Sequence, residues 1–330
     1  MKAKVLGVSV VGALAWGGVQ AATLTLYGEA QVEMASVDES ETQTEVADNA
    51  RGRLGVEAQE DLGGGLFGLA KFEFEVDTAD NAVEEGGEEE ETLDGREAFI
   101  GLQGGLGTLM LGNLRSPYKY SGGVNYDPFN ATYLEARGNG GMSAGAFGHE
   151  DFISNAVSYM TPNLGGVQFW LLYSPDERGD GQGSERDFAA SLLYQQAHFE
   201  MFVATVHDDA VLDDEDRDYD ALKFGGRYHQ GGHSLALQYE LIEDSGAAGE
   251  EGVDRDIWFL GYHYSNNKLT YALQFGQTKE DDVDDLNYWA LGLIYRYSKT
   301  FRGFLGYRAS DRDEDDASAF TLGARMAFSS

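Results

Sequence analysis

The chain has 330 residues, no cysteine and a formal charge of −34 at pH 7. The lack of cysteine excludes disulfides, thiolate nucleophiles and cysteine-ligated zinc sites. The acidic charge makes nucleic acid an unsuitable partner, because phosphate binding needs a basic face.

The first 21 residues have the pattern of a secretory signal peptide. Lys2 and Lys4 precede an apolar run over residues 5–16, and Val19-Gln20-Ala21 offers a small-residue cleavage site. The apolar run is too short to cross a membrane as a helix. We therefore expect residues 1–21 to be a signal peptide and residues 22–330 to form a single β-domain.

The remaining chain alternates between apolar and polar residues in short segments, which is the period of a β-strand. In residues 51–61, for example, Leu54, Val56 and Ala58 share one face and polar side chains the other. This pattern suits an all-β transmembrane antiparallel barrel, with lipid outside and water inside. We count about sixteen strands, at residues 23–35, 51–61, 66–77, 96–103, 108–114, 154–160, 167–173, 186–194, 199–206, 218–229, 233–242, 255–264, 268–277, 287–298, 300–308 and 317–328.

The connections between these strands alternate in length. Short turns such as Gly63-Gly64-Gly65 and Gln230-Gly231-Gly232 lie on one side of the pattern. The opposite connections are longer and acidic, at residues 38–49, 79–95, 208–216, 243–254, 280–286 and 310–316. Short periplasmic turns and long outer loops are typical of outer-membrane barrels, and aromatic residues at strand ends, Tyr27 among them, suit the membrane boundary.

Residues 116–152 form the longest segment without strand alternation. A structureless insertion of this length in a compact protein is usually functional. We interpret it as a loop that folds into the barrel lumen and sets the width and charge of a pore.

Five blocks of sequence carry a family resemblance: LTLYGEAQV, RLGVEAQEDLGGGL, REAFIGLQGGLGTLMLG, YMTPNLGGVQFWLLYS and FTLGARMAF. On these blocks, which are distributed over residues 22–330, the chain resembles the Gram-negative general diffusion porins. That resemblance implies a passive outer-membrane channel for ions and small hydrophilic solutes, a homotrimer, and contact with outer-membrane lipid and lipopolysaccharide. It implies no enzymatic activity and no cofactor.

The resemblance also implies a charged constriction. Its basic side would contain Arg53 and Arg96, together with Arg51 and Arg115, and its acidic side would contain Asp127 and Glu135 from the long loop. Two positions depart from the family pattern, since Glu29 and Met160 stand where basic residues are common. Because clusters of one charge bias ion selectivity, we expect these losses and the acidic outer loops to favour cations.

The acidic loops suggest two further roles. By resemblance, the loop that contains Glu84, Glu85, Glu88 and Glu89 is a candidate latch onto a neighbouring subunit. Clustered carboxylates could also bind divalent cations weakly, although the spacing of a calcium loop is missing and no specific metal site is predicted. The six histidines are scattered, without a catalytic metal, nucleophile or phosphate-binding motif.

Three alternatives remain open at this stage. A soluble β-sandwich or a repeat array could show the same alternation. A substrate-selective channel for sugars or phosphate would need a lengthwise aromatic or basic track, for which Phe67 and Trp170 are candidates. A structural or adhesive barrel would have the same strands but would not conduct.

Overall fold

The computed structural model describes residues 22–39, 42–79, 93–137, 142, 152–175, 186–212, 215–244, 252–280, 283–312 and 316–330. The strands in this part of the chain belong to one antiparallel sheet. They are β1 (Thr23–Asp38), β2 (Thr42–Ala47), β3 (Arg53–Gly63), β4 (Leu66–Val76), β5 (Leu93–Gly104), β6 (Gly107–Arg115), β7 (Phe152–Met160), β8 (Val167–Ser174), β9 (Asp187–Gln195), β10 (Phe199–Leu212), β11 (Glu215–Gln230), β12 (His233–Asp244), β13 (Arg255–Asn266), β14 (Leu269–Glu280), β15 (Val283–Arg296), β16 (Phe301–Asp311) and β17 (Ala317–Ser329).

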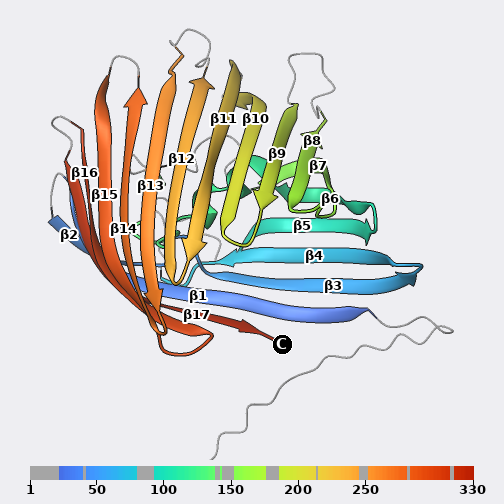
Figure 1. The fold of residues 1–330 in the computed structure, drawn as a ribbon, viewed down its shortest axis with the longest axis horizontal. Coiled ribbons are helices and arrows are strands. Elements are labelled where there is room, and N and C mark those ends of the chain that lie inside the picture. The colour runs from blue at the N-terminus through green and yellow to red at the C-terminus, as the bar shows by residue number, and fades with distance from the viewer. Residues whose placement is uncertain are drawn as a thin grey trace, which may run out of the picture.

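The sheet closes into a barrel because its first strand pairs with its last (Figure 1). β2 and β3 both pair with β1, on successive parts of its length, so together they occupy one position in the wall. The 17 strands therefore form a closed barrel of sixteen positions. This confirms the all-β, sixteen-stranded antiparallel barrel that the alternation predicts.

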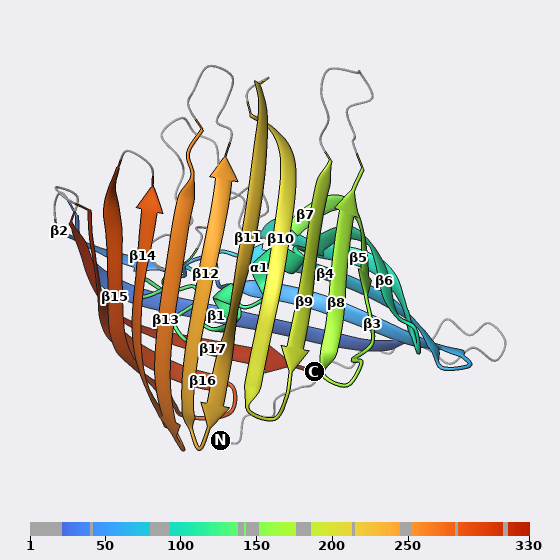
Figure 2. The ribbon, with the colours of Figure 1, turned by 45° about the horizontal axis from the view of Figure 1, so that its top comes forward.

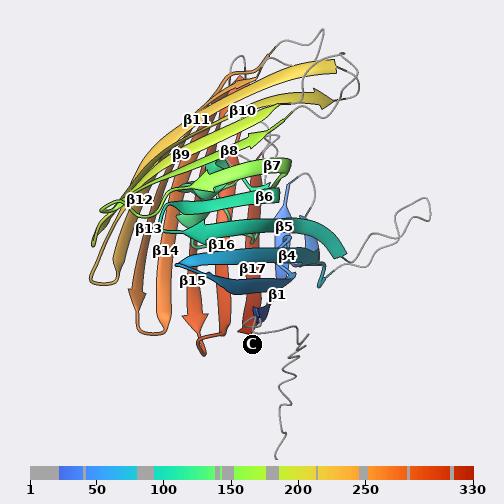
Figure 3. The same cartoon turned by 90° about the vertical axis from the view of Figure 1, so that its right-hand side faces the viewer.

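The alternation also decides which side chains face outward. Along β1, Val32 and Met34 are exposed on the outer wall, whereas Gln31 and Glu33 are buried inside the barrel. On β12, Leu235 and Leu237 are exposed in the same way. The curved outer wall seen in Figure 3 therefore presents apolar side chains, which is the condition for contact with lipid.

The short connections lie along one rim of the barrel, at the lower edge in Figure 2 for β9 to β16. The turn between β11 and β12 shows why its sequence is favoured. Gly231 and Gly232 both have left-handed backbone angles, with φ of 59° and 88°. A two-residue hairpin needs this conformation at both positions, and glycine adopts it without steric cost.

Three of the acidic segments expected to be loops are largely strand. β1 runs to Asp38 and returns as β2, and β10 runs to Leu212 before β11 begins at Glu215. In the same way β14 runs to Glu280 and β15 begins at Val283. The prediction of loops at residues 38–49, 208–216 and 280–286 was therefore wrong. Its error was to end a strand where apolar alternation ends, although backbone pairing can continue in water with polar side chains on both faces.

The sequence pattern suggested a uniformly polar barrel interior, but part of the interior is apolar. Inward-facing residues of β7–β15 form an apolar wall, with members such as Ala156, Leu172, Phe202, Ile257 and Ala290. The inward faces of β1, β3–β5, β16 and β17 carry most of the lumen charges. None of the helices in the described part of the chain has the length and apolar character that a membrane crossing requires.

Candidate functional site: a charged cavity in the barrel lumen

The segment after β6 turns into the barrel instead of leaving it. It begins with α1 (Pro117–Tyr120) and a short 3₁₀ turn, η1 (Gly123–Asn125), and α1 lies within the ring of strands in Figure 2. Tyr118, Tyr126 and Phe129 are each at most 3 % exposed and pack against the apolar wall. Burial of these apolar rings explains why the wall of β7–β15 is apolar: it is covered by the loop rather than by water.

Hydrogen bonds hold the loop to the apolar wall. The backbone N–H of Gly123 donates to Gln238 Oε1 over 2.6 Å, and Gln274 Nε2 donates to Asp127 Oδ1 over 2.5 Å. The Tyr288 hydroxyl lies 2.5 Å from the carbonyl oxygen of Leu134. The buried polar groups of the loop therefore find partners on β12, β14 and β15.

The far end of the loop is held by the opposite wall. Gln31 Nε2 donates to the carbonyl oxygen of Ala131, and Arg325 Nη2 donates to that of Asn130 over 2.9 Å. Glu33 accepts a bond from the backbone N–H of Tyr133. Residues 116–137 thus cross the lumen from β6 to β1 and β17, which narrows the free passage.

Between the loop and the charged wall lies a cavity of about 380 Å³. Its lining includes eight positively charged residues: Arg51, Arg53, Arg96, Arg115, Lys119, Arg137, Arg302 and Arg325. The structure therefore brings together the four arginines that the sequence analysis assigned to the basic side. Sequence reasoning missed Arg302 and Arg325, which stand opposite each other on β16 and β17 at inward positions of the alternation, and Lys119 of α1.

A network of paired charges covers the inner faces of β4–β6. Arg96 contacts Glu73 at 3.0 Å and Glu75 at 2.5 Å, while Arg115 contacts Glu97 at 3.0 Å. Lys71 Nζ lies 2.7 Å from Glu97. In this network each cation has a carboxylate close by, so its net charge is small.

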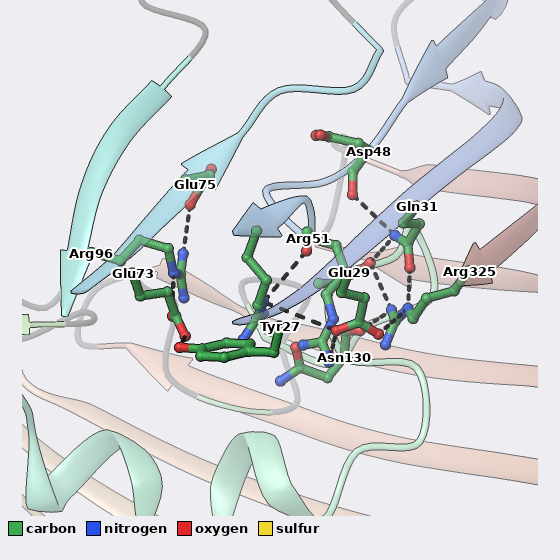
Figure 4. A network of polar contacts seen from close by, with 12 residues as sticks. Tyr27, Glu29, Gln31, Asp48, Arg51, Glu73, Glu75, Arg96, Asn130 and Arg325 are labelled. Carbon is green, nitrogen blue, oxygen red and sulfur yellow. Dashed lines mark hydrogen bonds and ion pairs between the residues drawn. The ribbon is translucent and has the colours of Figure 1, made fainter. Parts of the chain in front are cut away.

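Tyr27 belongs to the same network. Its hydroxyl donates to Glu73 Oε2 over 2.6 Å (Figure 4). The interpretation of Tyr27 as a residue of the membrane boundary was therefore wrong, because its ring points into the lumen. Its position near a strand end does not show which face of the sheet its side chain occupies. The two-residue alternation does, because Tyr27, Glu29 and Gln31 lie two residues apart and therefore share the inner face.

A second group of charges surrounds Glu29 (Figure 4). Arg51 Nη2 lies 2.9 Å from this carboxylate, Arg325 Nε lies 3.6 Å away and Arg53 Nε lies 4.0 Å away. Arg302 also interacts with Glu29 electrostatically. We call Arg51, Arg53, Arg302 and Arg325 the arginine cluster; it has a clear excess of positive charge.

The loop carboxylates predicted to face these arginines are used differently. Asp127 is 7 % exposed and accepts bonds from the backbone N–H groups of Phe129 and Ala136 and from Gln274. Within the described residues, no cation pairs with it at 4.0 Å or less. Asp127 therefore shapes the loop and also lines the cavity, and its role as the acidic side of the constriction stays a prediction. Its local sequence could not reveal the donors around it.

Glu135 also bonds within the loop. Its Oε2 accepts from the backbone N–H of Ala131 over 2.8 Å, and its Oε1 lies 3.3 Å from Arg137 Nε. A contribution of Glu135 to the acidic side stays a prediction. Glu84, Glu85, Glu88 and Glu89, the candidate latch, lie outside the described residues, as does much of the acidic surface suggested for divalent cations.

Burial raises the pKa of Asp127 to about 6, because desolvation disfavours its charged form. Between pH 4 and 6 an undocked carboxyl is ionised while the docked one keeps its proton, so loop docking should weaken by about 3 kcal/mol as the pH rises. The isosteric D127N variant should lack this dependence. The pH dependence of loop docking can be measured by hydrogen exchange of residues 116–137, compared between wild type and D127N at pH 4.5 and 7. A wild-type to D127N protection ratio that does not change with pH would contradict the assignment.

The sequence matches a family model described as Gram-negative porin over residues 7–328. It is 24% identical to a monosaccharide porin of Halomonas sp, over 90% of this chain and 76% of that protein. Among solved structures, the anion-selective porin from Comamonas acidovorans superposes with a TM-score of 0.79 at 20% identity, covering 93% of this chain and all of that one. The trimer form of OmpT, an outer membrane protein of Vibrio cholerae, superposes with a TM-score of 0.71 at 14% identity, covering 94% and 100%.

The family match extends over nearly the whole chain, and the closed barrel agrees with it. Members of this family are channels and not enzymes. The chain thus belongs to the Gram-negative porin family and is a diffusion channel of the outer membrane.

Proposed function

We propose that this porin passes ions and small hydrophilic solutes and that its narrow part prefers anions. The observation that carries the proposal is the cavity lining, with eight cations and a single carboxylate, Asp127, which is itself buried. Arg96, Arg115 and Arg137 are paired with carboxylates outside the lining, so the excess of positive charge is that of the arginine cluster. A cluster of one charge near a constriction concentrates ions of the opposite charge and repels the others. The anion-selective porin from Comamonas acidovorans, with its similar fold, is consistent with this preference.

The cation preference expected from Glu29 and Met160 finds no support in this geometry. That expectation counted missing basic residues, whereas Arg302 and Arg325 add two that were not counted. Glu29 is surrounded by the arginine cluster and cannot offset its charge alone. Salt screens solvent-exposed charges over about 8–10 Å, so acidic residues at the outer mouth would influence the narrow part only weakly.

A channel specific for sugars would display aromatic rings to the solute. Trp170 is only 9 % exposed, and its indole N–H donates to Ser158 Oγ over 2.8 Å. Its ring is therefore part of the wall rather than a binding surface. We propose a general channel, although one relative is named a monosaccharide porin.

Assembly into a homotrimer is part of this proposal. It is supported by the family and by the trimer form of the similarly folded OmpT. Contact with outer-membrane lipid follows from the apolar outer wall, and contact with lipopolysaccharide stays a prediction.

Planar-bilayer recording of the purified protein in a KCl gradient tests the proposal. We expect stepwise conductance and a reversal potential shifted toward the chloride equilibrium potential, because the solvent-accessible lining of the cavity is basic. A reversal potential shifted toward the potassium equilibrium potential would overturn the anion preference but leave the proposed channel function in place. Insertion without conductance would favour the structural or adhesive barrel.

A further inference from the structure

The carboxylate of Glu29 has more cationic neighbours than it can neutralise. Three arginines contact it at 2.9 to 4.0 Å, and Arg302 stands beside them, directly opposite Arg325 in the sheet register. Like charges placed opposite each other on neighbouring strands destabilise a sheet unless a counter-charge is present. Glu29 is that counter-charge, and its single negative charge faces the four positive charges of the arginine cluster.

The other carboxylates near the arginine cluster form their hydrogen bonds elsewhere, although Glu33 also interacts electrostatically with Arg325 and Glu73 with Arg53. Glu33 accepts bonds from Thr321, Asn49 and the backbone of Tyr133, while Glu73 is bound by Arg96 and Tyr27. In the described part of the chain, Arg302 has no ion pair within 4.0 Å. The cluster therefore retains unmatched positive charge facing the cavity.

The position of Glu29 is suited to competition with a solute. It lies on β1 opposite Arg53 with a 14 % exposed side chain, and its carboxylate contacts three arginines that line the cavity. Guanidinium groups bind carboxylates by charge-assisted, often bidentate hydrogen bonds, which do not distinguish a protein carboxylate from a dissolved one. A solute carboxylate and Glu29 would thus use the same donors.

We propose that Glu29 is a tethered competitor that determines how strongly the channel selects and holds anionic solutes, carboxylates in particular. It occupies the arginine cluster when no solute is present and weakens the binding of each anion that enters. This lowers the anion preference and keeps anions from being trapped, since conduction requires binding that is weak enough to release the ion. The inference rests on the proposed channel function and identifies a residue that sets its specificity.

The E29Q variant tests the proposal, because glutamine keeps the shape and removes the charge. Loss of a unit charge about 6 Å from the permeating ion should change the permeability of each ion about threefold, on Coulomb's law with a water-like dielectric. Chloride gains and potassium loses, so the chloride to potassium permeability ratio should rise about tenfold. Citrate, which carries three carboxylates, should block the chloride current at a concentration about thirtyfold lower than in wild type. Both are read from single-channel recordings, in which conduction itself reports a folded barrel.

E57Q is the matched control. Glu57 also lies on the inner face of the wall and has a 53% exposed side chain, but its ion pair is with Lys71 at 3.7 Å, outside the arginine cluster. We expect E57Q to shift the permeability ratio by less than half as much as E29Q. E29D keeps the charge and should behave as wild type, and E29A gives a second neutral variant should E29Q fail to assemble.

Two results would overturn the proposal: equal shifts in E29Q and E57Q, or a shift in E29D as large as in the neutral variants. The first would make Glu29 one lumen charge among many, and the second would make its effect structural. The wild-type reversal potential tests the anion preference separately. A channel that prefers potassium but still gains chloride permeability specifically in E29Q would retain the role of Glu29 and remove the proposed preference.

Discussion

Replacing Arg53 and Arg302 together by glutamine should lower the chloride to potassium permeability ratio about a hundredfold. Each unit charge about 6 Å from the passage changes the permeabilities of chloride and potassium about threefold in opposite directions at a water-like dielectric, so each is worth about tenfold in the ratio. Both residues line the cavity. Neither side chain holds the loop: that of Arg53 donates to the carbonyl oxygen of Arg51, and in the described part of the chain the side chain of Arg302 has no hydrogen-bond partner. The reversal potential in a KCl gradient, with the loop still docked, measures the effect.

The control is a second pair of arginines with the same change of charge. Arg255 and Arg312 both pair with Glu280, at 3.5 and 3.3 Å, and neither lines the cavity. We expect R255Q/R312Q to leave the permeability ratio close to wild type. If both double variants shift it equally, total charge rather than the cavity lining sets the selectivity.

The variant F129A should release the loop from the apolar wall. Phe129 is 1% exposed, and its ring lies where Gly292 leaves room: a Cβ on that glycine would lie 2.9 Å from Phe129 Cζ. Leu134 occupies the equivalent space at Gly306, the residue opposite Gly292 on β16. Truncation of a buried phenylalanine costs about 3–5 kcal/mol, which is enough to undock a loop held by a few such contacts.

We therefore expect F129A to increase single-channel conductance and its fluctuations while the barrel remains intact, because the wall strands keep their hydrogen bonds. The control is F304A. Phe304 is also buried inside the barrel, at 5% exposure, but it belongs to β16 and not to the loop. An increase in conductance of the same size in F304A, or none in F129A, would show that Phe129 does not hold the constriction.

The sequence by itself determined the class of fold and the inward or outward direction of most side chains. A period of two places Leu54 and Val56 outside and Arg53 inside without knowledge of the neighbouring strands, because it depends only on the local pleat. The turn at Gly231 and Gly232 is equally local, since their backbone angles are available mainly to glycine. Arg51, Arg53, Arg96 and Arg115 could be assigned to one wall for the same reason, with help from the resemblance.

The tertiary structure alone decided what these side chains meet. The partners of Asp127 come from its own loop and from Gln274, 147 residues away, so nothing near it in sequence indicates that its carboxylate is buried. The arginine cluster likewise joins β3 and the residue two positions before it with β16 and β17. Glu29 of β1 becomes its counter-charge only when the first strand pairs with the last. Closure of the barrel creates these contacts. Local periodicity specifies a face, whereas charge balance depends on which faces are brought together.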